Sequence, residues 1–149
     1  MSNEPTTTDH SLVPLSEVEC RQLLGESGVG RLAVVVGHQP DIFPVNYLVD
    51  EDTIVIRSAE GTKLAAALMG QLVAFEIDAF DAEHQAGWSV VVHGTATEDR
   101  SLPGTIRDGH LGLEPWADGT KSRYIHIAVN NISGRRLPPL AEPADRAQS

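Results

Sequence analysis

The sequence lacks the cysteines that stabilise many small secreted domains. Cys20 is the single cysteine among 149 residues, so no internal disulfide can form and a disulfide-framed domain is excluded. A chain of this length is the size of one domain and can bury an ordinary hydrophobic core without disulfides. There is no signal-peptide pattern, and no apolar run approaches the roughly 20 residues of a membrane-spanning helix. We therefore expect a soluble, cytoplasmic protein that does not enter a membrane.

Positive charge is also scarce. Eleven lysine and arginine residues stand against 21 aspartate and glutamate residues, which gives a formal net charge of −10. A nucleic-acid-binding surface needs a stripe of basic side chains to neutralise phosphates, so we expect no nucleic-acid partner. In such an acidic chain a local group of cations is informative, because the overall charge does not account for it.

Residues with metal-binding or catalytic chemistry are scattered. None of the six histidines has the spacing to Cys20 or to a second histidine that a metal site requires, so we expect no metal. His93 and His126 fall in predicted strands and are expected to be packed or hydrogen-bonded. Glu76 and Asp78 alternate outward on one strand, which argues against paired acid and base chemistry. No GxSxG pattern is present, so the catalytic residues stay unknown.

What the sequence does contain is a series of β-branched and apolar stretches separated by turns. Short connections between them favour an antiparallel sheet, and six strands favour a closed or split barrel over an open sheet with a bare edge. The expected fold class is mainly β with short helices, arranged as a six-stranded antiparallel split β-barrel. The predicted strands cover residues 30–36, 41–49, 53–59, 71–80, 88–98 and 122–137.

A helix is predicted before the strands, and both ends of the chain are expected to lie outside the domain. Ser16 and Glu19 have the spacing of a capping box, which indicates that a helix begins near them. Polar, proline-bearing ends cannot bury enough apolar surface to become ordered. We therefore expect a disordered tail over 1–13, one domain over 14–137 and a flexible tail over 138–149.

Two residues inside predicted strands carry a specific expectation. Pro44 cannot donate a hydrogen bond to a neighbouring strand, so it predicts a sheet edge or a bulge. Gly94 predicts a bulge or a close approach of another backbone.

The most informative stretch is "IRSAEGTKL", at residues 56–64, where a strand precedes a short predicted helix. It brings two cations and two hydroxyl groups together within seven residues: Arg57, Ser58, Thr62 and Lys63. The start of a helix offers unpaired backbone N–H groups, and these side-chain types bind phosphate oxygens. One interpretation is a phosphate-binding site. The other is that a hydroxyl only caps the helix while the two cations are solvated.

The order of these motifs resembles the pyridoxamine 5'-phosphate oxidase-like family of FMN-binding split barrels. The most specific part is "PVNY" followed by "IRSAEGTKL", and the resemblance is to the small, uncharacterised branch of the family. It implies FMN as the cofactor, with the phosphate held by the four residues just named. It also implies that Asn46 and the backbone of Val45 and Tyr47 lie along the flavin ring or the ribityl chain.

The resemblance further implies an obligate homodimer with two flavin sites at its interface. Trp88 would approach the flavin from either subunit, or would serve only as a core or interface aromatic. The function it implies is that of an FMN-binding flavoprotein, an oxidoreductase that passes electrons between the flavin and an unidentified small molecule. The alternatives are a 5-deazaflavin-dependent reductase of the same fold, a non-catalytic flavin-binding sensor or carrier, and a barrel that has lost its cofactor.

Overall fold

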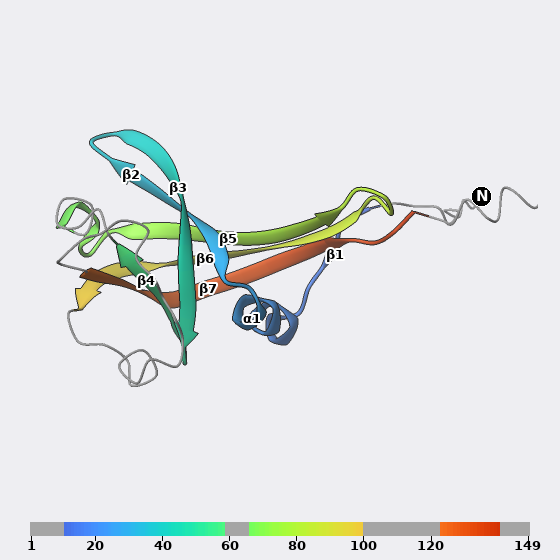
Figure 1. Ribbon diagram of the computed structural model, residues 1–149, viewed down its shortest axis with the longest axis horizontal. Helices are drawn as coiled ribbons and strands as arrows, with labels where there is room; N and C mark the ends of the chain where they lie inside the picture. The colour runs from blue at the N-terminus through green and yellow to red at the C-terminus, as the bar shows by residue number, and fades with distance from the viewer. Residues whose placement is uncertain (1–10, 59–65, 100–122, 141–149) are drawn as a thin grey trace, which may run out of the picture.

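A computed structural model of the chain describes residues 11–58, 66–99 and 123–140. No helix in these ranges is long and apolar enough to span a membrane. The labelled elements are, in chain order, β1 (Val13–Pro14), α1 (Glu17–Glu26), β2 (Val29–Val36), β3 (Gln39–Asp50), β4 (Thr53–Ser58), β5 (Leu72–Asp81), β6 (Ala86–Asp99) and β7 (Arg123–Leu137) (Figure 1).

Six long strands close into an antiparallel barrel. Their order is β7-β4-β3-β2-β5-β6, and β6 pairs with β7 again to complete the ring. The predicted fold class, a six-stranded antiparallel split β-barrel, is confirmed, and all six predicted strands are present with ends that differ by at most two residues. The two-residue strand β1, which pairs with Arg135 and Arg136 of β7, was not predicted.

The barrel encloses one hydrophobic core. Because strand side chains alternate between two faces, every second residue of β4 and β7 points inward. Each large aliphatic side chain buried in this way stabilises the fold by about 1.5–3 kcal/mol. The fully buried side chains of the core include Leu32, Ile54, Ile56, Phe75, Ile77, Val92, Ile125 and Ile127.

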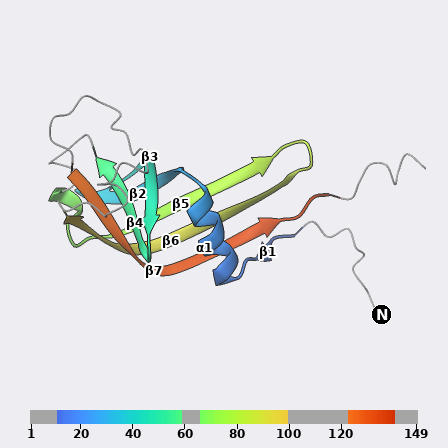
Figure 2. The same cartoon turned by 60° about the horizontal axis from the view of Figure 1, so that its bottom comes forward.

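Helix α1 packs against β7 and also contacts β3 and β6 (Figure 2). It begins at the predicted capping box, where Ser16 Oγ accepts from the Glu19 N–H at 3.1 Å and Glu19 Oε1 accepts from the Ser16 N–H at 2.9 Å. Cys20 and Leu24 are its buried residues. At the other end, the Tyr47 hydroxyl donates to the Leu24 carbonyl at 2.6 Å, which satisfies one of the last carbonyls of the helix.

The two residues singled out inside the strands behave as predicted. Pro44 pairs with β2, whereas the pairing of β3 with β4 covers only 47–50, so Pro44 has a neighbouring strand on one side only. Gly94 follows a register shift after His93, and a Cβ atom at this position would collide with the Ala128 carbonyl. Gly94 therefore marks both a bulge and a close backbone approach.

Strands β5, β6 and β7 run on together past α1, away from β3 and β4 (Figure 1). We call this end of the three strands, residues 78–89 and 134–137, the arm, and the short β1 pairs with β7 along it. Its ladder extends from Asp78 paired with Ser89 to the turn at 82–85, with β7 alongside up to Leu137. The side chain of Phe80 is 67% exposed there, which leaves apolar surface of the arm in contact with solvent.

Candidate functional site at the end of strand β4

The predicted phosphate-binding residues begin at the end of β4. Arg57 and Ser58 are the last two residues of that strand, and their backbones pair with Tyr124 and Arg123 of β7. The other two predicted phosphate ligands, Thr62 and Lys63, lie outside the described residues, as does the first half of the short helix predicted over 61–70. Of that helix, the structure describes a helical turn at 66–68.

The outward face of β4 and its two neighbouring strands extends up to this strand end. The alternation along β4 places position 57 on the face of Val55, opposite to the inward face of Ile54 and Ile56. Val55 pairs with Leu48 on one side and with His126 on the other, so these residues share its face. We call this surface the outer β4 face, and its described members are Asn46, Leu48, Val55, Tyr124 and His126.

Two polar side chains on the outer β4 face have no hydrogen-bond partner among the described residues. Nε2 of His126 is buried and has no partner in the described ranges, so of the two expectations for this ring, packed or hydrogen-bonded, this nitrogen fits the packed one. The side-chain amide of Asn46 is half-buried and makes no hydrogen bond within the described ranges. A buried polar atom without a partner costs about 1–3 kcal/mol. Both groups fit a ligand that offers hydrogen-bonding heteroatoms, as a flavin ring does.

Val45 and Tyr47, which flank Asn46, turn their side chains to the barrel interior. Tyr47 is 4% exposed and lies edge-on to Phe75, with ring centroids 4.8 Å apart. Its burial raises the pKa of the Tyr47 hydroxyl to about 12. The Tyr47 backbone N–H already donates to the Gly28 carbonyl at 3.1 Å. In this segment Asn46 therefore supplies the side chain of the outer β4 face, and the backbone contacts implied for its neighbours stay predictions.

Trp88 lies far from the β4 end within one subunit. It pairs with Arg136 on the arm, twelve residues along β7 from Tyr124, the partner of Arg57. At about 3.3 Å per residue, the path along β7 is about 40 Å. Figure 1 places β4 and the arm toward opposite ends of the molecule. A single subunit does not bring Trp88 close to the end of β4.

The acidic residues of β5 belong to an ion-pair network on the surface. One guanidinium nitrogen of Arg31 lies 3.3 Å from Glu76 Oε1 and 3.3 Å from Asp78 Oδ1. Partial burial and the neighbouring Asp78 carboxylate raise the pKa of Glu76, and Arg31 acts in the opposite direction. The two carboxylates therefore share one arginine at the strand surface.

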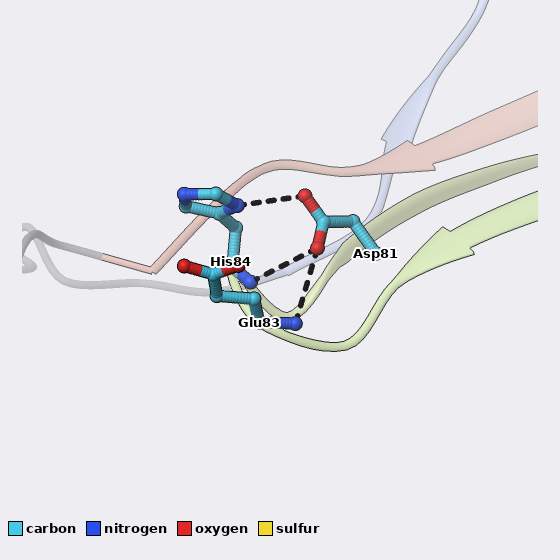
Figure 3. Close-up of side chains that lie close together, drawn as sticks. All are labelled: Asp81, Glu83 and His84. Carbon is cyan, nitrogen blue, oxygen red and sulfur yellow. Dashed lines mark hydrogen bonds and ion pairs between the residues drawn. The ribbon is translucent and has the colours of Figure 1, made fainter.

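A second group of titratable side chains holds the turn at the tip of the arm (Figure 3). Asp81 Oδ1 accepts hydrogen bonds from the backbone N–H groups of Glu83 and His84, at 3.1 and 3.4 Å, and Asp81 Oδ2 lies 2.7 Å from His84 Nδ1. The hydrogen bond from the His84 ring lowers the pKa of Asp81. All three residues are exposed. Because both carboxylate oxygens of Asp81 stabilise the turn, we assign this cluster a structural role.

The family model described as pyridoxamine 5'-phosphate oxidase matches residues 16–136. This chain belongs to the pyridoxamine 5'-phosphate oxidase family. The match covers both "PVNY" and "IRSAEGTKL", so the resemblance seen in the sequence is confirmed.

Relatives and similar solved structures cover about 85% of the chain. The uncharacterized protein Rv0080 of Mycobacterium tuberculosis is 31% identical over 131 residues, which is 85% of this chain and 86% of that protein. A structure called the FAD binding protein from Mycobacterium smegmatis is 31% identical, covers 86% of this chain and 100% of its own, and has a TM-score of 0.65. An FAD-binding protein from Mesorhizobium loti is 25% identical, covers 85% of this chain and 96% of its own, and has a TM-score of 0.66.

Proposed function

We propose that this member of the pyridoxamine 5'-phosphate oxidase family binds a flavin and passes electrons between that flavin and a small molecule. The observation that carries the proposal is the similarity, over nearly the full length of both chains, to the FAD binding protein of Mycobacterium smegmatis. The free hydrogen-bonding groups of the outer β4 face support it, because a flavin offers partners for both.

In this proposal the chain binds and orients the cofactor. Arg57 and Ser58, together with Thr62 and Lys63, hold the flavin phosphate at the end of β4, where cations and hydroxyls suit phosphate oxygens. The Asn46 amide and Nε2 of His126 form hydrogen bonds with the flavin along the outer β4 face. A bound flavin supplies the electron-transfer chemistry, so no acid, base or nucleophile is required of the described residues.

The resemblance in the sequence predicts FMN, whereas two similar structures are of FAD-binding proteins. A phosphate group follows the ribityl chain in both cofactors, at the end of FMN and inside FAD. The residues at the β4 end can therefore hold the phosphate of either one. A 5-deazaflavin-dependent reductase and a non-catalytic sensor or carrier stay as alternatives, because the fold is compatible with each of them.

The distance between Trp88 and the β4 end supports a homodimer. If Trp88 contacts the flavin, the arm that carries it must come from the second subunit, since its own lies about 40 Å away along β7. The exposed Phe80 on the same arm is apolar surface that a second subunit would cover. We therefore propose two flavin sites, each built from the β4 end of one subunit and the arm of the other.

The direct test is reconstitution of the purified protein with FMN, FAD and a 5-deazaflavin coenzyme, each followed by gel filtration and a visible spectrum. We expect a flavin spectrum to co-elute with the protein. Retention of the deazaflavin alone would favour the alternative reductase, and an empty protein in all three experiments would contradict the proposal. Turnover of the bound flavin with added electron donors and small-molecule acceptors then separates an oxidoreductase from a carrier.

A further inference from the structure

The two faces of the arm carry different side chains. Trp88 and Arg136, which pair across β6 and β7, share one face with Val90 of the core, because strand side chains alternate. The neighbouring pair, Ser89 and Arg135, lies on the opposite side, which points away from the core. We call this side the outer arm face, and its members used below are Ser89, Val91, Ser133 and Arg135.

The four members of the outer arm face stand at the corners of a rectangle. Ser89 is paired with Arg135, and two residues further along β6, Val91 is paired with Ser133. Paired side chains on adjacent strands are about 5 Å apart at Cβ, and residues two apart along one strand are separated by about 7 Å. The rectangle therefore brings one guanidinium and two hydroxyl groups within reach of a single small ligand.

A hollow of about 290 Å³ lies over this rectangle. Its lining is Leu12, Pro14, Ser89, Val91, Ser133, Gly134 and Arg135. Leu12 and Pro14 come from the segment that pairs with β7 as β1, and with Val91 they give the hollow an aliphatic surface beside its polar groups. Phe80 and Trp88 do not line it, so the hollow is separate from the contacts proposed above for a second subunit.

The polar groups of the hollow have no partner among the described residues. Arg135 makes no ion pair there, and the hydroxyls of Ser89 and Ser133 make no hydrogen bond there. In contrast, Arg21 and Arg31 each contact two carboxylates. A guanidinium donates paired hydrogen bonds to a carboxylate or a phosphate. In a chain with a net charge of −10, an arginine without a carboxylate partner therefore indicates a place where an anion binds.

The charges beside the hollow favour a ligand with a single negative charge. Asp78 pairs with Ser89, and Glu76 pairs with Val91, so two carboxylates lie next to the outer arm face on β5. Within the described part of the chain they share one cation, Arg31, at 3.3 Å from each. A phosphate monoester carries nearly two negative charges at neutral pH, so these carboxylates repel it more strongly than they repel a carboxylate ligand.

We propose that the outer arm face binds a small carboxylic acid with an aliphatic body. The carboxylate accepts hydrogen bonds from Arg135 and from the two serine hydroxyls, while the aliphatic part packs against Leu12, Pro14 and Val91. A volume of about 290 Å³ is at the lower end for small-molecule sites, so the acid is a short one. The inference does not rest on flavin binding, because no group of the hollow is among those proposed to hold the flavin.

The test is a titration of the full-length protein with hexanoate, hexanamide and hexyl phosphate, followed by the NMR signals of the backbone amides. We expect hexanoate to shift the signals of Ser89 and Arg135 in a saturable way. Hexanamide has the same aliphatic body without the charge and should bind at least tenfold more weakly. Hexyl phosphate should also bind more weakly than hexanoate. The inference is overturned if hexanoate does not bind, or if either of the other two compounds binds as tightly.

Two matched variants, Arg135→Gln and Arg136→Gln, remove the same charge from adjacent exposed residues on opposite faces of the arm. Arg135→Gln should weaken hexanoate binding about tenfold through the loss of a charge-assisted contact, and Arg136→Gln should leave it unchanged. Equal losses in the two variants would show a general effect of charge and would overturn the inference.

A third variant, Ser133→Ala, tests the site without changing its charge. It removes one hydroxyl of the rectangle and should weaken hexanoate binding about threefold, as expected for one neutral hydrogen bond. All three variants should keep the melting temperature of wild type, because the substituted side chains are exposed. Unchanged hexanoate binding in both Ser133→Ala and Arg135→Gln would place the ligand elsewhere and contradict the proposal.

Discussion

At the scale of single residues, Tyr47 joins the barrel to helix α1. Its hydroxyl donates to the Leu24 carbonyl at 2.6 Å, and its ring packs edge-on to Phe75 in the core. In Tyr47→Phe the ring stays but the buried carbonyl loses its donor. We expect the free energy of unfolding to fall by about 1–3 kcal/mol, measured by urea denaturation at neutral pH. An unchanged midpoint and slope would show that the carbonyl finds another partner.

The same residue predicts a response to alkaline pH. Burial raises the pKa of Tyr47 to about 12, above the value of about 10 for an unfolded tyrosine. A raised pKa means that the contribution of Tyr47 is complete below pH of about 10 and is lost as the pH rises toward 12. The stability of wild type should therefore decline over this range more steeply than that of Tyr47→Phe. Parallel pH profiles for the two proteins would contradict this assignment.

Substitution of His126 tests whether its ring binds the flavin or only packs within the protein. Its buried Nε2 has no partner in the described structure, so replacement by phenylalanine removes an unsatisfied polar atom and keeps a ring of similar shape. We expect His126→Phe to leave the melting temperature of the cofactor-free protein unchanged or raised, and to weaken flavin binding about tenfold. A marked drop in stability with unchanged flavin affinity would assign the ring to packing alone.

At the scale of elements, the bulge in β6 depends on a residue without a Cβ atom. A side chain at Gly94 would collide with the Ala128 carbonyl on β7, so Gly94→Ala forces the two strands apart. We expect a loss of about 1–3 kcal/mol in the free energy of unfolding, which is typical of overpacking. Gly25→Ala in helix α1 is the control, because its Cβ would meet open space, and it should stabilise the protein by about 0.5–1 kcal/mol. Similar losses in both variants would contradict the role of the bulge.

The elements that could be predicted from the sequence are those with a local signal. Alternating apolar residues and turn residues predicted all six long strands, and the spacing of Ser16 and Glu19 predicted the start of α1. β1 has only two residues and forms because β7 offers an edge, which no local pattern reveals. The unpartnered nitrogen of His126 was missed for a similar reason. Its environment is made by Val55 and other residues distant in the sequence.

The candidate site could be predicted only in part from the sequence. "IRSAEGTKL" indicated phosphate chemistry because its cations and hydroxyls are close together along the chain, and the structure places the first of them at the end of β4. The separation of Trp88 from this strand end depends on how far β6 and β7 extend beyond the barrel, and strand patterns do not give the register of paired strands.

At the scale of the whole molecule, the arm predicts a dimer. An obligate dimer of this kind should bury roughly 2,000 Å² or more in total and should sediment as a dimer at micromolar concentration. Phe80→Glu places a charge on the exposed apolar tip of the arm and should shift the protein toward monomers. Ile42→Glu is the control, since Ile42 is 67% exposed on β3, away from the arm. A wild-type monomer, or two variants with equal effects, would contradict this arrangement.

The central claim, that the chain holds a flavin by its phosphate at the end of β4, is tested most directly by comparing FMN with riboflavin. Riboflavin has the same ring and ribityl chain but no phosphate. The measurement is the dissociation constant of each compound for wild type and Arg57→Ala. We predict that FMN binding weakens ten- to hundredfold in the variant through the loss of a charge-assisted hydrogen bond, while riboflavin, already weak, changes little. Equal losses for both compounds, with a lower melting temperature of the cofactor-free variant, would show that Arg57 is structural and would contradict the account.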